Sequence, residues 1–421
     1  MKTEGSKPKL VFVGNGMAGT RTLEELLALT SDKYDISVIG EEHFGNYNRI
    51  MLSPVLAGEK TIDNIMLNDD QWYKQNHVTF YKGEQAVAIN RKKRLVTTAG
   101  GQQIPYDRLV LATGSTPFRI PVPGNDLNNV LTFRDINDVN SMLELSRHKQ
   151  HAAVIGGGLL GLEAANGLRK QGMAVTVVHA YDAILNRQLD KTASHLLQTN
   201  LEEKGIQFCM NAATQSIQGN ADNEATRLNF KDGRHLDVDM VVMATGVQPN
   251  IHLAKSCGLQ CDRGILVNDV MQTFDPAIYA VGECVQHRGQ LFGLVAPSYD
   301  HAKVCANHLA EMGIARYRQK ALATQLKITG IHAFSAGQFD NVANSEEIAY
   351  FDAQSQHYKK LVVVDNRLVG AVLYGDTQDG GWFFELIQEQ KDISPIRDQL
   401  IFGKDFCQWP EQASDHLPEA A

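Results

Sequence analysis

The sequence predicts an α/β fold with two Rossmann-like dinucleotide-binding domains, followed by a small α+β domain at the C-terminal end. Three observations carry this prediction. A buried-strand run, a glycine turn and a helical pattern follow one another twice, at residues 10–26 and 152–168, as in nucleotide-binding βαβ units. A strand ending in Ala-Thr-Gly comes after each turn, at residues 106–114 and 238–246. Residues 321–421 hold seven basic and fifteen acidic side chains, which accounts for the whole net charge of −8 and marks a separate domain.

The composition is that of an ordinary globular protein long enough for two or three domains. Hydrophobic residues make up 43% and charged residues 21% of the 421 residues, which is close to average usage. The sequence has no apolar run of about 18 residues, and its first residues do not read as a secretory signal. We therefore expect a cytoplasmic protein without a membrane segment. The negative net charge also argues against nucleic-acid binding, which needs a basic surface.

The first glycine turn reads as a complete nucleotide-binding unit. Residues 9–13 form an apolar strand-like run, and leucines at helical spacing follow over residues 20–29. In such a turn the first glycine permits the tight bend, the second lets a pyrophosphate approach the backbone, and the third lets the helix pack on the strand. The next strand-like run ends at Glu41, whose carboxylate can accept hydrogen bonds from ribose hydroxyls. The three glycines are Gly14, Gly16 and Gly19.

The second turn has the same form but lacks the carboxylate. Residues 151–155 lead into the turn as a strand-like run, and a helical pattern and another strand follow. That strand ends in His179, with Asp182 three residues later. An acid at the end of this strand favours NADH and a cation favours NADPH. The strand ends in neither, so the sequence does not cleanly specify the coenzyme. Because residues 179–182 include no cation, we favour NADH. The three glycines are Gly156, Gly158 and Gly161.

Two dinucleotide sites in one chain indicate that one nucleotide is a resident cofactor and the other visits to deliver a hydride. The repeated Ala-Thr-Gly strands indicate an internal duplication. A further strand-like run, residues 274–283, ends at Gly282 and Glu283, and a helix is expected to begin near Pro297. We place the first nucleotide-binding domain at residues 1–120 and 246–320, the second at 121–245, the C-terminal domain at 321–405 and a tail at 406–421.

The order of these motifs resembles the two-dinucleotide-binding flavoprotein family that includes glutathione reductase, rubredoxin reductase and ferredoxin reductases. Over about residues 8–405 the chain further resembles the flavin-containing N-terminal part of the NAD(P)H nitrite reductase large subunit, in segments such as YNRIMLSPVLAGEKTIDNI and GAVLYGDTQDGGWFFELI. The resemblance implies a glutathione-reductase-type fold, resident FAD, and NADH or NADPH as electron donor. That subunit continues into iron–sulfur and sirohaem modules, whose cysteine sets are absent here, so we do not expect this chain alone to reduce nitrite.

The resemblance also implies roles for individual residues. FAD would lie in the first fold, with its adenosine ribose at Glu41 and its ribityl chain at Glu283. Arg49 and Ser53 match the stretch that runs beside the flavin, and Glu163 would lie near the nicotinamide. These three are the expected catalytic residues, and the alternative for Ser53 and Glu163 is a solvated or capping role. Further cofactor contacts are implied for Gly14, Gly16, Gly19, Thr113, Gly114, Gly156, Gly158, Gly161, His179, Gly246 and Gly282.

The cysteines do not allow a thiol relay. Disulfide reductases of this family pass electrons through a C-x4-C beside the flavin, but the corresponding stretch, residues 44–61, has no cysteine, and none precedes Cys209. Pro54 also stands where many relatives carry a lysine near the flavin. Cys257 and Cys261 are close in sequence, which is weak evidence for a metal, and we assign none. Electrons are therefore expected to leave the flavin directly.

The expected function is an NAD(P)H oxidoreductase that feeds a nitrite or nitrate reductase subunit, directly or through a small iron–sulfur protein. Two alternatives stay open: a rubredoxin or ferredoxin reductase of another pathway, and a flavoprotein sensor or assembly partner that does not turn over. Basic residues at 301–330 could steer an acidic carrier or simply form a solvated linker. They are Lys303, Arg316, Arg318, Lys320 and Lys327.

The C-terminal domain is expected to combine strands over residues 325–337 and 360–375 with a helix over residues 381–390. It resembles the rubredoxin-reductase C-terminal domain, and it could cover the flavin or make a homodimer contact. Ser394 is expected to cap a further helix whose first position is Pro395.

Overall fold

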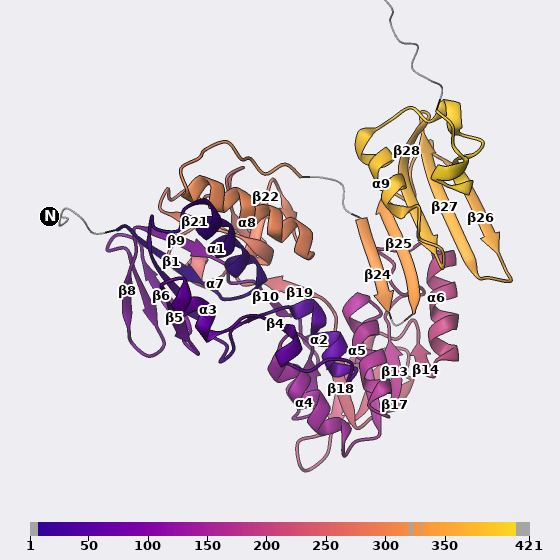
Figure 1. The fold of residues 1–421 in the computed structure, drawn as a ribbon. Coiled ribbons are helices and arrows are strands. Elements are labelled where there is room, and N and C mark those ends of the chain that lie inside the picture. Colours follow the sequence, from indigo (N-terminus) through magenta and orange to yellow (C-terminus); the bar gives the residue numbers. More distant parts are fainter. Residues whose placement is uncertain (1–6, 320–322, 329, 410–421) are drawn as a thin grey trace, which may run out of the picture. The chain divides into compact units, whose positions relative to one another are not determined.

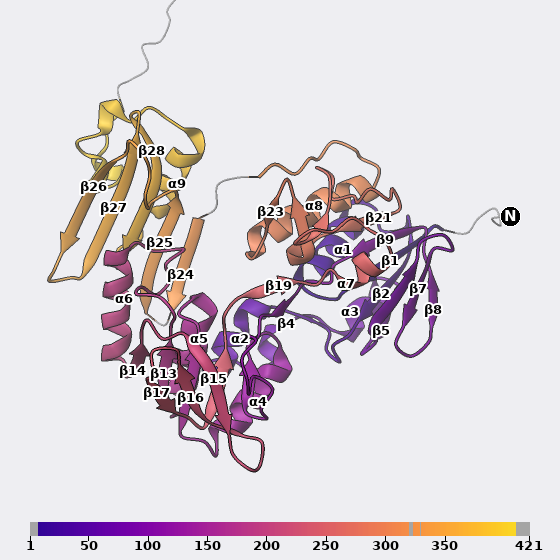
Figure 2. The same cartoon turned by 180° about the vertical axis from the view of Figure 1, so that it is seen from behind.

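The computed structural model describes residues 7–319, 323–328 and 330–409, which form two compact units (Figures 1 and 2). No helix within these described ranges is long and apolar enough to cross a membrane. The first unit comprises Met1–Ile155, Gly167–Ala174 and Thr214–Arg318, and the second comprises Gly156–Asn166, Val175–Ala213 and Gln319–Ala421.

The first nucleotide fold is a five-stranded parallel sheet in the first unit, in the order β21-β9-β1-β2-β5. Its strands are short, mostly buried runs of Val, Ile, Leu and Phe, as expected for a parallel sheet with both faces covered. Helices α1 (Met17–Leu29) and α8 (Val295–Leu309) pack against each other (Figure 1). The strands are β1 (Lys9–Val13), β2 (Asp35–Gly40), β5 (Val78–Lys82), β9 (Arg108–Leu111) and β21 (Ile278–Ala280).

The parallel register gathers the predicted motif residues at one edge of this sheet. The N–H of Ala112 donates to the Val13 carbonyl, and that of Val281 donates to the Leu111 carbonyl. The glycine turn, the first Ala-Thr-Gly segment and the Gly282–Glu283 pair therefore all follow the carboxyl ends of neighbouring strands, where α/β folds bind their ligands.

Smaller elements of the first unit lie outside this sheet. The helices are α2 (Leu52–Leu56), α3 (Asp70–Gln75) and α7 (His252–Ser256). The strands are β3 (Asn46–Tyr47), β4 (Met66–Asn68), β6 (Ala86–Asn90), β7 (Leu95–Thr98), β8 (Gln103–Pro105), β20 (Ile265–Leu266), β22 (Val285–His287) and β23 (Gln290–Leu291).

A second five-stranded sheet has the order β11-β18-β12-β13-β14. It contains β11 (Val130–Thr132), β12 (His151–Ile155), β13 (Ala174–Val178), β14 (Ile206–Cys209) and β18 (Met240–Met243). The helices that accompany these strands in the chain are α4 (Ile136–Ser146), α5 (Leu159–Lys170) and α6 (Lys191–Glu203). A three-stranded meander consists of β15 (Thr214–Gly219), β16 (Ala225–Phe230) and β17 (His235–Asp237).

The two Ala-Thr-Gly repeats meet in the structure. Each is followed by a short strand, β10 (Ser115–Pro117) after the first and β19 (Val247–Pro249) after the second. The two strands pair antiparallel, with Thr116 opposite Gln248. The duplication that the sequence indicates is thus expressed as a direct pairing of its two copies.

The C-terminal part is an antiparallel sheet, β24-β25-β28-β27-β26, with helix α9 (Gly380–Glu389) packed on β25 and β28 (Figure 2). Its core includes Phe334, Leu361 and Phe383. The predicted helix capped by Ser394 is wrong, because Ser394–Ile396 is a 3-10 turn and the Ser394 hydroxyl donates to Asp392 instead. The strands are β24 (Ala323–Ile328), β25 (Ile331–Gly337), β26 (Glu346–Asp352), β27 (His357–Val364) and β28 (Arg367–Tyr374).

Candidate dinucleotide-binding sites

The first glycine turn has the geometry that a pyrophosphate needs. Gly14 has φ +109°, and a Cβ on it would lie 2.1 Å from the Ala112 carbonyl oxygen. A Cβ on Gly19 would lie 2.7 Å from the Gly14 oxygen. By contrast, a Cβ on Gly16 would meet nothing within 4 Å. The first and third glycines are therefore required by the protein itself, whereas the second leaves open space where a ligand can approach.

Helix α1 begins directly at this turn with its amino end available. Gly16 is the N-cap and offers no side-chain cap, and the first turn has no acidic residue. The N–H groups at such a helix end favour an anion. Asn15 holds the turn in shape, because its side-chain oxygen accepts from Tyr73 Oη at 2.7 Å and its carbonyl accepts from Asn46 Nδ2 at 2.9 Å. The sequence patterns do not single out Asn15.

The two carboxylates after β2 have different surroundings. Glu41 is exposed, and its Oε1 accepts one hydrogen bond, from Gln85 Nε2 at 3.1 Å. Glu42 is half-buried, accepts from Tyr47 Oη at 2.6 Å and forms an ion pair with Arg49. Burial raises the pKa of Tyr47, so its hydroxyl stays protonated and can donate. Glu41 thus presents an exposed carboxylate after β2, while Glu42 orients Arg49. A contact of Glu41 with ribose hydroxyls stays a prediction.

Arg134 joins two predicted site residues that come from distant parts of the sequence. Arg49 Nη1 donates to the Arg134 carbonyl at 3.2 Å, and the Arg134 guanidinium forms an ion pair with Glu283. Ser115 Oγ donates to the same Glu283 carboxylate at 2.6 Å. Arg134 directly precedes the N-cap of α4, and no motif in the sequence points to it. The Glu283 carboxylate is therefore held in position from two sides.

The first Ala-Thr-Gly segment is tied by reciprocal hydrogen bonds to Asn250, the residue after β19. Thr113 Oγ1 donates to the Asn250 carbonyl at 2.7 Å, and Asn250 Nδ2 donates back to the Thr113 carbonyl at 2.9 Å. Gly114 and Gly246 both have positive φ, +64° and +113°. Gly282 has φ +83°, and a Cβ there would lie 2.7 Å from the Ala18 Cβ. Gly282 therefore permits the close approach of helix α1 to the end of β21.

The second glycine turn repeats the open position. Gly156 has φ +126° and donates to the Val178 carbonyl at 2.9 Å, while a Cβ on Gly158 would meet nothing within 4 Å. His179 is tied into the turn itself: its Nδ1 accepts from the Gly157 N–H at 3.0 Å, and its Nε2 lies 3.0 Å from the Ala183 carbonyl. Burial lowers the pKa of His179, which favours the neutral ring that this pattern requires. Both ring nitrogens are thus engaged by the protein.

The remaining predicted residues lie on helices. Glu163 is partly buried on α5, four residues after its start, and Gly161 is buried on the same helix. Ser53 lies on α2, where its carbonyl accepts from the Ala57 N–H at 2.9 Å. Their contacts with cofactors stay predictions.

The thiols have no arrangement suited to electron relay. All six cysteines are free, and no cluster of His, Cys, Asp or Glu able to hold a metal ion occurs in the described part of the chain. Cys284 follows Glu283 directly, but its Sγ points to the Val281 and Leu111 carbonyls, 3.3 and 3.6 Å away. Burial raises the pKa of the Cys284 thiol, which keeps it protonated and unreactive.

Comparisons with known proteins agree with this geometry. The chain is 47% identical over 388 residues to the NAD(P)H nitrite reductase of Bacillus subtilis (strain 168), covering 92% of this chain and 48% of that protein. It is 45% identical over 395 residues to the assimilatory nitrate reductase electron transfer subunit of the same strain, covering 94% and 51%. The chain thus spans about half the length of these relatives. A solved covalent complex of putidaredoxin reductase with putidaredoxin matches with a TM-score of 0.84 and 25% identity, covering 95% of this chain and 97% of that chain.

Family models cover both the nucleotide folds and the C-terminal part. Residues 323–391 match the rubredoxin NAD+ reductase C-terminal domain. Residues 8–308, which contain both glycine turns and both Ala-Thr-Gly segments, match the pyridine nucleotide-disulphide oxidoreductase model. Proteins of this family use FAD and NAD(P)H, in agreement with the two open turns. The chain belongs to the pyridine nucleotide-disulphide oxidoreductase family.

Proposed function

We propose that this chain is an FAD-dependent NAD(P)H oxidoreductase that passes electrons to a separate redox protein in nitrite or nitrate assimilation. The observation that carries the proposal is the pair of open glycines, Gly16 and Gly158, each in a turn that is otherwise closed by the protein's own packing. The two curated relatives, a nitrite reductase and a nitrate reductase electron transfer subunit, support the metabolic assignment.

The residues of the first fold fit FAD. Gly16 leaves room for the pyrophosphate, Glu41 exposes a carboxylate for the ribose, and Arg134 and Ser115 hold Glu283 ready to accept from the ribityl hydroxyls. When bound, FAD would supply the exchange between two-electron and one-electron transfer. The protein binds and orients both nucleotides. Hydride transfer between them needs no acid or base from the protein.

The thiols support transfer to a separate acceptor rather than to a disulfide. Residues 44–61 contain no cysteine, and Cys284 points its thiol into the sheet. A small iron–sulfur protein or a nitrite or nitrate reductase subunit is the acceptor class we propose. The match of residues 323–391 to a rubredoxin reductase domain favours one second candidate, a rubredoxin or ferredoxin reductase of another pathway. A homodimer through this domain stays a prediction.

We place the protein in the cytoplasm. All six cysteines are free thiols, which persist in reducing compartments.

Flavin reduction and acceptor reduction test the proposal separately. The purified protein should be yellow, and its flavin absorbance at about 450 nm should bleach rapidly when NADH or NADPH is added without oxygen. The reduced protein should then reduce an iron–sulfur carrier in proportion to the NAD(P)H consumed. A yellow protein that neither nucleotide bleaches would instead be a sensor or assembly partner. If the flavin bleaches rapidly but the preferred acceptors are carriers of other pathways, the result would favour a rubredoxin or ferredoxin reductase.

A further inference from the structure

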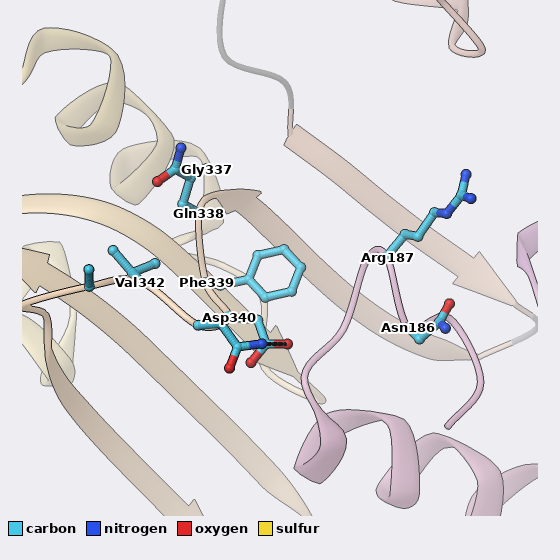
Figure 3. A pocket seen from close by; sticks show the side chains of 9 residues that line it. Asn186, Arg187, Gly337, Gln338, Phe339, Asp340 and Val342 are labelled. Atoms are coloured by element: carbon cyan, nitrogen blue, oxygen red, sulfur yellow. Dashed lines mark hydrogen bonds between the residues drawn. The ribbon is translucent and has the colours of Figure 1, made fainter. Parts of the chain in front are cut away.

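A cavity of about 350 Å³ lies in the second unit, where Asn186 and Arg187 stand across from residues 337–343 (Figure 3). Asn186 and Arg187 belong to the loop that follows β13 in the second nucleotide fold. This cavity therefore adjoins a site already described. A cavity of about 300 Å³ in the first unit has no such relation, because no residue of either glycine turn lines it.

The cavity of the first unit lies at the opposite end of the parallel sheet from the first glycine turn. Tyr34 directly precedes β2, Arg108 is the first residue of β9, and Tyr279 lies in β21. The predicted cofactor residues follow the carboxyl ends of these same strands. Strand β9 alone has four residues, which span roughly 13 Å. A small ligand in this cavity is therefore separated from the nucleotide-binding motifs by the length of the strands.

Arg108 gives the cavity a positive charge. Its Nη1 donates to the Asp107 carbonyl at 3.1 Å, and no ion pair in the described part of the chain engages its guanidinium. Glu311 also lines the cavity, but it pairs with Lys33 at 2.9 Å. Lys33 lowers the pKa of Glu311, so this pair is charged on both sides and neutral in sum. The guanidinium of Arg108 is thus left to attract an anion.

His308 adds a hydrogen-bond donor to the lining. Tyr279 Oη accepts from Gln272 Nε2 at 3.3 Å and lies 2.9 Å from His308 Nδ1. Burial, and then the charges of Arg316 and Arg108, lower the pKa of His308, which favours a neutral ring. The Tyr279 hydroxyl donates to Nδ1 of this ring, so the His308 proton lies on Nε2. The ring therefore carries its N–H on the side away from Tyr279.

The other walls of the cavity are largely apolar. Tyr34 and Tyr279 contribute aromatic rings, and Pro276 and Leu309 contribute aliphatic surface. Tyr34 Oη donates to the Leu309 carbonyl at 2.8 Å, which offsets the negative end of α8 at this wall. The planar fork of Arg108 matches the two oxygens of a carboxylate. Since pockets of small ligands begin at roughly 300 Å³, the cavity has room for a small ring that bears one carboxylate.

We propose that this cavity binds a small planar carboxylate. Arg108 holds the carboxylate, His308 Nε2 donates a second hydrogen bond to it, and the rings of Tyr34 and Tyr279 enclose the apolar body. The site is distinct from both dinucleotide sites, and the inference does not depend on the proposed function. Because the ligand binds the folded sheet, it stabilises the first nucleotide fold by mass action.

Benzoate and its neutral isostere benzamide test the charge that this site is proposed to recognise. Calorimetry on the full FAD-loaded protein should give benzoate about tenfold or more higher affinity than benzamide, because a charge-assisted bond to a guanidinium is stronger than a neutral one. Arg108→Gln should lower the affinity for benzoate about tenfold or more and leave that for benzamide nearly unchanged. The control Arg147→Gln removes an exposed arginine on α4 and should change neither affinity.

Further variants separate loss of the site from loss of the fold. Arg108→Lys keeps the charge without the planar fork and should retain part of the affinity for benzoate. His308→Gln, at the partly exposed end of α8, should weaken benzoate severalfold. Flavin content and melting temperature without benzoate show whether each variant is folded. Benzoate should raise the melting temperature of the parent protein, but not that of Arg108→Gln.

Four results would overturn the inference. They are a parent protein that does not bind benzoate, equal affinities of the parent for benzoate and benzamide, equal effects of Arg108→Gln and Arg147→Gln, and competition of benzoate with NAD(P)H or FAD. The last result would place benzoate in a nucleotide site. Selective binding of benzoate by a protein whose flavin neither nucleotide bleaches would instead count against the proposed function alone.

Discussion

At the scale of single residues, the glycines of a nucleotide-binding turn separate into those that folding needs and those that the ligand needs. Gly14 combines a positive φ with a carbonyl 2.1 Å from the position of a Cβ, whereas Gly16 and Gly158 face open space. Substitutions at these glycines can therefore separate a folding defect from a loss of nucleotide binding.

We expect Gly16→Val to fold normally and to lose FAD, because the added side chain fills the space of the pyrophosphate. Gly14→Val should lose stability as well, since it forces a β-branched residue into a strained backbone against a carbonyl. The matched variant Gly158→Val should keep FAD but lose reduction by NAD(P)H. Flavin absorbance per protein, thermal melting and anaerobic reduction measure the three effects. A fully yellow Gly16→Val protein would contradict the FAD assignment.

His301 gives the first nucleotide fold an acid sensitivity. The side chain is fully buried, and its two ring nitrogens have no hydrogen-bond partner among the described residues. Its ring packs edge-on against Phe292 and Tyr317, with ring centroids 4.6 and 4.5 Å apart. Burial, and secondarily the charge of His287, lower the pKa of His301 to about 3. Since the folded state favours the neutral ring, its contribution to stability is complete above the unfolded pKa of about 6.5 and is lost as the pH falls toward 3.

The expected loss is about 2 kcal/mol between pH 7 and pH 5. His301→Leu removes the titrating group and should therefore flatten the decline of the melting temperature over this range. Thermal melting of both proteins at several pH values between 7 and 5 measures the difference. A variant with the same pH dependence as the parent would show that another group controls acid stability.

The candidate site residues that the sequence indicates are those whose position is set locally, and their contacts with cofactors stay predictions. Glu41 follows its strand directly, and the glycines occupy fixed places in a turn. Arg134 and Asn250 could not be predicted, because their partners, Glu283 and Thr113, come from distant segments that only the folded sheet brings together. His179 differs from both groups. The sequence indicates it as a cofactor contact, but its Nδ1 accepts a hydrogen bond from Gly157 in the glycine turn.

At the scale of elements, prediction succeeded where burial pattern and turn chemistry agreed. Strands β1 and β12 lie at the expected residues 9–13 and 151–155, because uninterrupted apolar runs before a glycine turn suit buried parallel strands. Helix α8 begins at Val295, close to the expected Pro297. The helix expected after Ser394 failed because a local side-chain bond to Asp392 competes with the cap.

The start of α6 is an element on which stability should depend strongly. Asp190 caps the helix and also accepts from Tyr358 beside the buried Lys360. Asp190→Ala removes the cap and leaves Lys360 with Glu347 as its remaining carboxylate, so we expect a loss on the order of 3 kcal/mol. Tyr358→Phe should cost about 1 kcal/mol. Chemical denaturation measures both. Equal, small losses would show that the ion pair is not needed.

At the scale of the whole molecule, charge is distributed unevenly along the chain. The acidic surplus lies after residue 320, while Lys303, Arg316 and Arg318 precede it and are exposed. Lys320, predicted as part of the same basic patch, lies outside the described residues, as does the side chain of Lys327. The assignment of this patch to a carrier or to a solvated linker therefore depends on a kinetic test.

Electrostatic steering predicts a specific signature for the basic patch. Replacing Lys303, Arg316 and Arg318 by Gln should leave reduction of the flavin by NAD(P)H unchanged, because neither nucleotide turn is touched. Transfer to an acidic iron–sulfur carrier should slow severalfold at low salt and converge with the parent at high salt, where screening removes the attraction. The control replaces Lys92, Lys93 and Arg147, three exposed cations elsewhere, so that net charge changes equally. If both triple variants slow the carrier alike, total charge rather than this patch sets the encounter rate.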